Sequence, residues 1–311
     1  MAAAPAISAT GLTKSYGDKA VLRGVDLEIP AGSVFALLGP NGAGKTTTVQ
    51  ILSTLIPADG GTARVAGHDV DREAGGVRKT IGVTGQFSAV DNLLTAEENL
   101  LLMADLNHLR RREGRRRAED LMRRFDLTEA SRQAVVTYSG GMRRKLDLAM
   151  TLVGDPEVIF LDEPTTGLDP RSRRTMWEII RSLVADQGVT IFLTTQYLEE
   201  ADRLADRIAV LDGGRIVAEG TAEELKRIVP GGRIRLQFAD AARLATAAAL
   251  FEYAEADTEA LRLEIPGDNS VLTVKAVLDT LDNASAPAES LVVETADLDD
   301  VFLRLTGEGV R

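Results

Sequence analysis

Residues 39–47 read GPNGAGKTT, and this stretch decides the fold of the chain. It follows residues 33–38 (SVFALL), a nearly continuous apolar run that is typical of a buried parallel strand. A helical pattern begins near Lys45. The phosphate-loop pattern G-x-x-x-x-G-K-[ST] is matched by Gly39, Gly44, Lys45 and Thr46. A strand before this pattern and a helix after it are the context that supports it, so the stretch predicts a phosphate-binding loop in an α/β fold.

The chemistry of such a loop comes from its backbone and from two side chains. Glycines let backbone N–H groups close around phosphates, and the helix N-terminus adds positive potential. We expect Lys45 to reach the β- and γ-phosphates and the Thr46 hydroxyl to ligate Mg²⁺. The loop residues predicted to bind nucleotide are Gly39, Pro40, Asn41, Gly42, Ala43, Gly44, Lys45, Thr46 and Thr47. The alternative is a glycine-rich turn with a surface lysine.

Two acidic residues end a second apolar run. Residues 157–164 read EVIFLDEP, which predicts a buried strand that ends at Asp162 and Glu163. In phosphate-loop enzymes an acidic residue in this place holds Mg²⁺, and Glu163 is then placed to orient or deprotonate an attacking water. The alternative is a pair of acids that caps a loop.

Two further stretches place polar residues at the start of a helix. Residues 138–142 (YSGGM) precede an amphipathic helical pattern, so Ser139, Gly140 and Gly141 form either a second anion-binding helix end or an ordinary helix N-cap. Residues 191–202 read IFLTTQYLEEAD, where an apolar strand stops before Gln196. The carboxyl edge of an open parallel sheet is where ligands bind. Gln196 is therefore a candidate site residue, and a polar cap at a turn is the alternative.

The pattern of strands and helices predicts two domains. Strands are expected at 7–12, 21–29, 33–38, 158–161, 189–193, 208–211 and 215–219, and helices from 45, at 97–109, 114–127, 142–153 and 172–185. Alternation of this kind indicates a mainly parallel, doubly wound sheet. Residues 90–155 form a helical insert in a domain that spans 1–228. Residues 229–311 form a small α+β domain, with strands at 233–238, 260–265 and 291–294 and helices at 241–251, 270–281 and 298–305.

Composition limits the classes of function. The 311-residue chain carries a net charge of −11, which argues against a nucleic-acid binder because neutralising phosphates needs a basic face. It has no cysteine and therefore no disulfide or thiolate metal site. Neither a secretory signal nor an apolar run of about 18 residues is found, so we expect a soluble, cytoplasmic-type protein. Residues 110–117 (RRREGRRR) read as a solvated charged turn, or alternatively as a contact for anionic headgroups or a membrane partner.

Taken in order, these motifs resemble those of the ATP-binding subunits of ABC transporters, over residues 5–225. GPNGAGKTT resembles the Walker A motif, VIFLDEP resembles Walker B, and YSGGM resembles the signature LSGGQ with Tyr138 and Met142 as departures. Further matches are Tyr16 to the aromatic that stacks on adenine, Gln86 to the glutamine that touches Mg²⁺, and Asp169 to the loop that crosses to the opposite subunit. Taken singly, these three residues are also consistent with an edge-strand aromatic, a turn residue and a helix cap.

The resemblance implies a P-loop ATPase core with an antiparallel β portion and a helical insert. It implies ATP and Mg²⁺ as cofactors, with Thr46, Gln86 and Asp162 as metal ligands. Two subunits would pack head to tail as a homodimer, with ATP between one Walker A loop and the other subunit's Ser139, Gly140 and Gly141. A separate integral-membrane permease would use closure and hydrolysis for alternating access, which places the chain on the cytoplasmic face of the cell membrane.

Gln196 stands where the family usually has a histidine that contacts the γ-phosphate. Glutamine offers an amide donor and an acceptor but cannot become a cation, so we expect Gln196 to sense the γ-phosphate and Glu163 to be the catalytic base. TTQYLEEAD, the extra C-terminal domain and the ending ADLDDVFLRLTG resemble the daunorubicin/doxorubicin-resistance exporter branch. That branch implies efflux of a hydrophobic small molecule. The alternatives are a soluble ABC-type ATPase that acts on DNA or ribosomes, and a regulatory module that binds ATP but hardly cleaves it.

Overall fold

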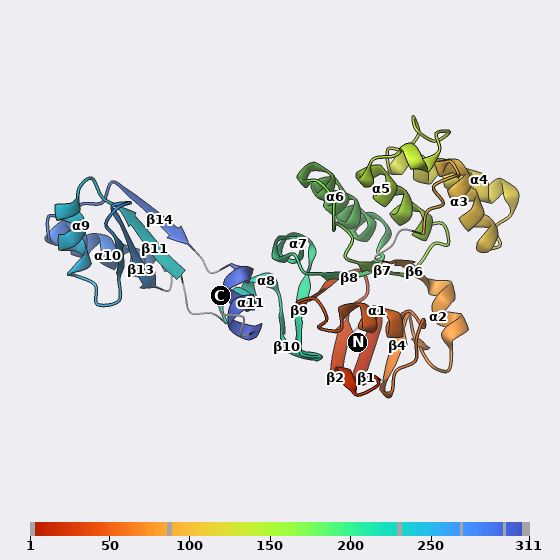
Figure 1. Ribbon diagram of the computed structural model, residues 1–311, viewed down its shortest axis with the longest axis horizontal. Helices are drawn as coiled ribbons and strands as arrows, with labels where there is room; N and C mark the ends of the chain where they lie inside the picture. Colours follow the sequence, from red (N-terminus) through yellow and green to blue (C-terminus); the bar gives the residue numbers. More distant parts are fainter. Residues whose placement is uncertain (1–3, 86–88, 229–231, 268–269, 295–296, 307–311) are drawn as a thin grey trace. The chain divides into compact units, whose positions relative to one another are not determined.

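The structure is a computed structural model that describes residues 4–85, 89–228, 232–267, 270–294 and 297–306 (Figure 1). The chain divides into two compact units, Met1–Ala222 and Glu223–Arg311. The predicted boundary between residues 228 and 229 lies where the described residues stop, at 229–231, so that boundary stays a prediction.

A six-stranded sheet in the order β10-β9-β3-β8-β7-β6 organises the first unit. Five of its strands are parallel, and only β10 runs antiparallel to its neighbour. Every residue of β3, β7 and β8 is buried, which explains why their sequences are apolar runs without alternation. The strands are β3 (Val34–Leu38), β6 (Ile81–Thr84), β7 (Val158–Asp162), β8 (Thr190–Thr195), β9 (Arg207–Asp212) and β10 (Arg215–Gly220).

A second, antiparallel sheet in the order β2-β1-β4-β5 completes the β structure of this unit. Its strands are β1 (Ile7–Tyr16), β2 (Lys19–Ile29), β4 (Gly60–Val65) and β5 (His68–Asp69). One apolar cluster joins Leu12 and Val25 of this sheet, Val49 and Leu52 of helix α1 (Lys45–Leu52), and Phe192 of the mixed sheet. The helix that follows the phosphate loop is therefore anchored in a core shared by both sheets.

The centre of the mixed sheet is held by aromatic packing. The Phe192 ring lies 5.7 Å from the Phe35 ring and 5.6 Å from the Phe160 ring, measured between centroids, and all three side chains are buried. These contacts join β3, β7 and β8, the strands whose carboxyl ends carry the candidate site residues. The remaining helices of the α/β core are α2 (Ala74–Thr80), α6 (Pro170–Gln187) and α7 (Leu198–Leu204).

The helical insert lies between β6 and β7, as predicted, and its three main helices group together (Figure 1). They are α3 (Ala96–Leu106), α4 (Arg111–Arg124) and α5 (Gly140–Thr151), with a short 3₁₀ turn, η1 (Val135–Thr137), before α5. Helix α3 begins with a capping box in which Thr95 and Glu98 satisfy each other's backbone N–H. The arginine-rich residues 110–117 differ from the predicted turn, because α4 begins at Arg111 and buries Gly114 and Ala118.

The second unit contains an antiparallel sheet in the order β12-β13-β11-β14. Its strands are β11 (Gly232–Gln237), β12 (Glu255–Asp257), β13 (Arg262–Gly267) and β14 (Ser290–Glu294). Helices α9 (Ala241–Ala248) and α10 (Val271–Asn283) contribute Leu244, Val277 and Leu281 to a separate core. Helices α8 (Ala222–Lys226) and α11 (Leu298–Thr306) lie at the two ends of this part of the chain. The predicted α/β and α+β classes are both confirmed.

Among the residues that the structure describes, no helix combines the length and apolarity needed to cross a membrane.

Candidate nucleotide-binding site

The carboxyl ends of β3, β7 and β8 bring the predicted site residues to one edge of the sheet. In the strand register Leu38 lies opposite Thr195, and Asp162 lies opposite Thr194. A hollow of about 350 Å³ opens at this edge, and its lining includes loop residues and one acid from the end of β7. The residues that line it are Lys19, Val21, Asn41, Gly42, Gly44, Lys45, Thr46, Thr47 and Glu163.

Two glycines of the loop are restricted, Gly39 by a close backbone neighbour and Gly44 by its positive φ and a close side chain. A Cβ atom on Gly39 would lie 2.3 Å from the carbonyl oxygen of Leu211. Gly44 has a φ of 113°, and a Cβ there would lie 2.6 Å from a methyl group of Leu22. The motif glycines are therefore required both by the conformation of the loop and by its close approach to β2 and β9.

Lys45 is held inside the loop by backbone carbonyls. Its ammonium group donates to the carbonyl oxygens of Gly39, at 2.8 Å, and Pro40, at 3.2 Å. The Glu163 carboxylate lies 3.7 Å away. Burial lowers the pKa of Lys45, while Glu163 and Asp162 act in the opposite direction. The side chain is only 5% exposed, and it lines the hollow together with Glu163.

Asp162 is buried at the end of β7 and is fixed by the neighbouring strand. The Thr194 hydroxyl donates to its carboxylate. Thr46, the other predicted metal ligand in the described residues, is exposed at the start of α1. The buried acid therefore ends β7, and the hydroxyl lies just after the loop that follows β3; β8 separates these two strands in the sheet. Gln86, the third predicted ligand, lies outside the described residues.

Glu163 adopts a left-handed backbone conformation, with a φ of 49°. Its N–H donates to Thr194, 3.1 Å from both the carbonyl oxygen and the hydroxyl oxygen. One carboxylate oxygen accepts from the Thr166 hydroxyl at 3.3 Å. Such a conformation costs a non-glycine residue about 1–2 kcal/mol. The surrounding hydrogen bonds hold the carboxylate where it lines the hollow beside Lys45.

Gln196 lies directly after β8 and is partly buried. The carbonyl oxygen of Thr195, its neighbour, accepts from the N–H of Gly39 at 3.3 Å, so this turn is attached to the start of the phosphate loop. The Thr195 hydroxyl accepts from the N–H of Tyr197 at 2.9 Å and shapes the same turn. Gln196 is thus at the predicted sheet edge, and its contact with a γ-phosphate stays a prediction.

The Ser139-Gly140-Gly141 segment forms the N-terminus of α5. Ser139 is the N-cap, and its hydroxyl accepts from the N–H of Met142 at 3.2 Å. A Cβ on Gly141 would lie 2.6 Å from the Ser172 hydroxyl, so the helix start packs closely against α6. Tyr138 is buried, and its hydroxyl donates to the Ala130 carbonyl at 2.7 Å, which accounts for a tyrosine at this position. Ser139 and Gly140 are exposed and do not line the hollow at the phosphate loop.

Asp169 caps helix α6. Its carboxylate accepts from the N–H groups of Arg171 and Ser172, both at 3.0 Å, and from the Ser172 hydroxyl. The hydrogen bond from the Ser172 side chain is the largest of the interactions that lower the pKa of Asp169. The helix-cap alternative from the sequence therefore describes its contacts in this subunit, and a role across a subunit interface stays a prediction.

Tyr16 ends β1, where it pairs with Lys19 at the tip of the β1–β2 hairpin. Its side chain is 50% exposed, and the Lys14 ammonium lies 5.9 Å from the ring centroid. Lys19, its partner in the hairpin, lines the hollow. An exposed aromatic ring beside the phosphate loop suits stacking on a base, although adenine contact stays a prediction.

One buried residue near this edge was missed by sequence reasoning. Glu200 of α7 is 0% exposed, and one of its oxygens accepts from the Thr165 hydroxyl, at 2.7 Å, and the Trp177 indole N–H, at 3.1 Å. It thereby joins α7 to α6 and to the segment that follows Glu163. In the sequence it is the second of two glutamates in a helix, a pattern that normally indicates a solvated surface.

Burial raises the pKa of Glu200, while Thr195, Thr165, Trp177 and Arg173 oppose that shift. Folding therefore favours the neutral form of Glu200 relative to the unfolded chain. Its stabilising contribution is complete below the unfolded pKa, near 4.5, and is lost as pH rises through the folded value. Glu200→Gln stays neutral, so its free energy of unfolding should improve relative to wild type as pH rises.

This difference is measured by urea unfolding from pH 4.5 to 8.5, followed by fluorescence of Trp177, the only tryptophan of the chain. Glu200→Ala leaves two buried donors without their acceptor and should cost about 1–3 kcal/mol for each of them. A constant difference between wild type and Glu200→Gln across the pH range would contradict the prediction.

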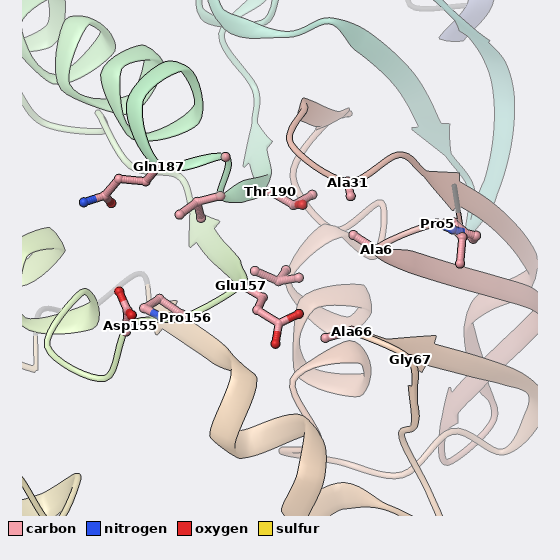
Figure 2. Close-up of a pocket in the computed structure, with 14 residues that line it drawn as sticks. Pro5, Ala6, Ala31, Ala66, Gly67, Asp155, Pro156, Glu157, Gln187 and Thr190 are labelled. Carbon is pink, nitrogen blue, oxygen red and sulfur yellow. The ribbon is translucent and has the colours of Figure 1, made fainter. Parts of the chain in front are cut away.

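Another hollow, of about 660 Å³, lies at the opposite, amino ends of β7 and β8 (Figure 2). Figure 2 shows the Glu157 carboxylate among small residues such as Ala6, Ala31 and Gly67. This hollow is larger than the one of about 350 Å³ at the phosphate loop, but no phosphate-loop residue lines it. We assign it no ligand.

The residues at the carboxyl edge fit a nucleoside triphosphate with Mg²⁺. Gly39 and Gly44 have no side chain, so the loop backbone can approach β9 and β2 closely. Lys45 supplies a buried ammonium group. Asp162 offers carboxylate oxygen and Thr46 hydroxyl oxygen, the hard donors that Mg²⁺ prefers. The donor set therefore matches the predicted cofactors.

Comparisons with known proteins agree with this geometry. A family model described as ABC transporter matches residues 22–166. The daunorubicin resistance ATP-binding protein DrrA3 of Streptomyces coeruleorubidus is 50% identical, over 98% of this chain and 97% of that protein. The daunorubicin/doxorubicin resistance ATP-binding protein DrrA of Streptomyces peucetius is 47% identical, over 97% of this chain and 92% of that protein.

Among solved structures, a dimeric ATP-binding cassette in a post-hydrolysis state, bound to ADP and phosphate, superposes with a TM-score of 0.63. It is 25% identical, and the match covers 69% of this chain and 98% of that one. The match in fold therefore extends over nearly the whole of that cassette.

Proposed function

The chain belongs to the ATP-binding subunits of ABC transporters and is an ATPase of that type, and from this premise we propose that it powers export of a hydrophobic small molecule through a separate permease. The observation that carries the proposal is the shared hollow: a phosphate loop and Glu163 line one space at the end of the central strands. The names of the relatives, which concern daunorubicin resistance, support a drug-like substrate.

Within one subunit we propose the following roles. Lys45 and the loop N–H groups bind the phosphates, and Thr46, Asp162 and Gln86 are the residues that would hold Mg²⁺. When bound, this ion neutralises charge that develops on the phosphate oxygens. Glu163 accepts a proton from the attacking water. Its carboxylate lies 3.7 Å from the Lys45 ammonium, the group proposed to bind the phosphates, and is therefore close to the reacting phosphate.

The site becomes complete only in a dimer. Ser139 and Gly140 are exposed at the N-terminus of α5, whereas the described residues around the phosphate loop come from other elements. A helix N-terminus is a ready anion site. In a head-to-tail homodimer Ser139, Gly140 and Gly141 would face the nucleotide of the other subunit, and Asp169 would lie near the same interface. Binding of ATP would close this dimer and hydrolysis would reopen it.

Gln196 is proposed to donate its amide N–H to the γ-phosphate. Replacing one positioned donor of this kind typically lowers kcat about 10²-fold or more, and we expect Gln196→Ala to show such a loss in steady-state MgATP hydrolysis. Gln196→His restores a donor and should recover much of the rate. Glu199→Gln, at an exposed position on α7, is the control that should match wild type. If Gln196→Ala hydrolysed ATP at the wild-type rate, the γ-phosphate contact would be contradicted and Gln196 would be only a turn residue.

The substrate and the membrane partner are tested together. A six-helix membrane protein encoded in the neighbouring reading frame would be the permease to co-express with this chain, and inside-out vesicles are then assayed for MgATP-driven uptake of daunorubicin. We expect uptake with the wild-type chain and none with Glu163→Gln, although both variants should co-purify with the permease on the cytoplasmic face. Equal uptake with and without the chain would contradict the proposal.

A further inference from the structure

Arg144 lies on α5, one turn after Gly140 and Gly141, and reaches the ends of two strands. Its Nε donates to the carbonyl oxygen of Pro164 at 2.8 Å, and Nη2 donates to that of Asp162 at 3.3 Å. Nη1 donates to the Gly85 carbonyl, after β6, at 3.2 Å. A single guanidinium therefore links the helical insert to the carboxyl edge of the catalytic sheet.

Asp147 orients this guanidinium. One oxygen of the buried Asp147 carboxylate accepts from Arg144 Nη1 at 3.0 Å, and the other accepts from the N–H of Ala89 at 3.2 Å. The side chains of Arg144 and Asp147 are 12% and 3% exposed. A planar guanidinium with a fixed acceptor presents its remaining N–H groups in one direction, which lysine cannot reproduce.

The acceptors of Arg144 bracket Glu163. Asp162 and Pro164 are its two chain neighbours, and Glu163 itself has the left-handed φ of 49°. The hydroxyl oxygen of Thr194, on β8, accepts a hydrogen bond from the Glu163 N–H. Conformations of this kind persist only where the surroundings enforce them. Arg144 from the insert and Thr194 from the sheet both supply such restraints to this peptide segment.

We propose that Arg144, oriented by Asp147, is a positioning residue that fixes the backbone on both sides of Glu163 and makes the catalytic carboxylate depend on the placement of helix α5. This inference rests on the proposed role of Glu163 as the base. Because α5 begins at the Gly140–Gly141 segment, the same helix that would face one nucleotide controls the base that acts on the other. A misplacement of about 1 Å at a reacting group is enough for a 10²-fold loss of rate.

A purely structural ion pair predicts different kinetics. Loss of a structural pair lowers stability and affects ATP binding and turnover alike. A positioning residue that acts through Glu163 lowers kcat, leaves ATP affinity nearly unchanged, and has no further effect once the carboxylate is gone. The double variant with Glu163→Gln therefore separates the two explanations.

The experiment uses the full chain and measures the Kd for ATP, kcat and thermal stability. Arg144→Gln should lower kcat by roughly 10²-fold, with an ATP Kd within about threefold of wild type. Arg144→Lys should recover part of the rate. In the Glu163→Gln background Arg144→Gln should not lower the residual rate further. The matched control is Lys145→Gln on the same helix, where the Lys145 ammonium lies 3.9 Å from the exposed Asp126 carboxylate.

Hydrogen exchange of a peptide that covers residues 160–168 gives a second readout that does not require activity. Arg144→Gln should speed exchange in this peptide, and Lys145→Gln should not. The inference is overturned if Arg144→Gln hydrolyses ATP at the wild-type rate while Glu163→Gln is inactive, if its loss adds in full to that of Glu163→Gln, or if exchange is unchanged. Wild-type turnover by Glu163→Gln would instead overturn the role of the base, and this inference with it.

Discussion

Glu163→Gln is expected to lower kcat for MgATP hydrolysis by at least about 10²-fold while ATP still binds. Glutamine has the same shape, so the contact with the Thr166 hydroxyl and the backbone hydrogen bonds to Thr194 can remain. What is lost is a carboxylate that takes a proton from water. Lys45, 3.7 Å away, also loses its negative neighbour, which favours rather than weakens phosphate binding.

Equilibrium binding of ATP and steady-state release of phosphate measure the two halves of this prediction. Glu157→Gln is the matched control, because it makes the same substitution at the exposed, opposite end of the same apolar run. It should leave kcat unchanged. If Glu163→Gln turned over at a rate near that of wild type, another group would have to serve as the base.

Lys45→Ala is expected to weaken ATP binding by about 10- to 100-fold. The removed ammonium group would make charge-assisted hydrogen bonds to phosphate, each with a value of about 1.5–3 kcal/mol. The carbonyl oxygens of Gly39 and Pro40 would also lose the ammonium donor, so the loop would lose both hydrogen bonds that Lys45 makes to its backbone. Hydrolysis should be undetectable at ATP concentrations that saturate the wild-type chain.

Isothermal titration with MgATP measures this loss directly, and Lys79→Ala, at an exposed position on α2, is the control for the change in net charge. Thermal unfolding shows whether the loop variant is folded. An ATP affinity within threefold of wild type would contradict a phosphate-binding role for Lys45.

The sequence was informative where an apolar run ends in a polar residue. The runs that form β3, β7 and β8 are entirely buried, so the strands could be located from the sequence, although β7 ends one residue and β8 two residues later than predicted, at Asp162 and Thr195. Since parallel strands end at one edge, the sequence predicts Lys45, Glu163 and Gln196 at that edge; Lys45 and Glu163 line one hollow there, and Gln196 follows β8 directly. The phosphate loop could also be recognised from the sequence, because the glycines, the lysine and the threonine of its pattern each have a separate physical role.

Sequence reasoning failed where a side chain acts far from its own element. Glu200 belongs to a helix whose acidic pattern suggests solvent, yet Thr165 and Trp177 from other elements enclose it. Arg144 is one of several basic residues after the Ser-Gly-Gly segment, and only tertiary structure shows that it reaches Asp162 and Pro164. Local spacing contains no information about such long contacts.

Short or glycine-containing strands were the other omission. Strand β4 begins with two glycines. The second, Gly61, has a φ of 87°, and a Cβ atom there would lie 2.4 Å from the carbonyl oxygen of Gly11. Strand β5 has two residues. Two residues, or a start of two glycines, are too short an apolar pattern to identify either strand from the sequence.

The left-handed backbone of Glu163 bears on how this protein can evolve. Glycine is the residue that such a conformation favours. Selection for stability alone therefore favours glycine at this position, whereas selection for hydrolysis favours glutamate. A lineage selected only for a robust fold would lose the carboxylate first. On the proposed role of Glu163 as the base, the chain keeps catalytic chemistry at the expense of a more relaxed backbone.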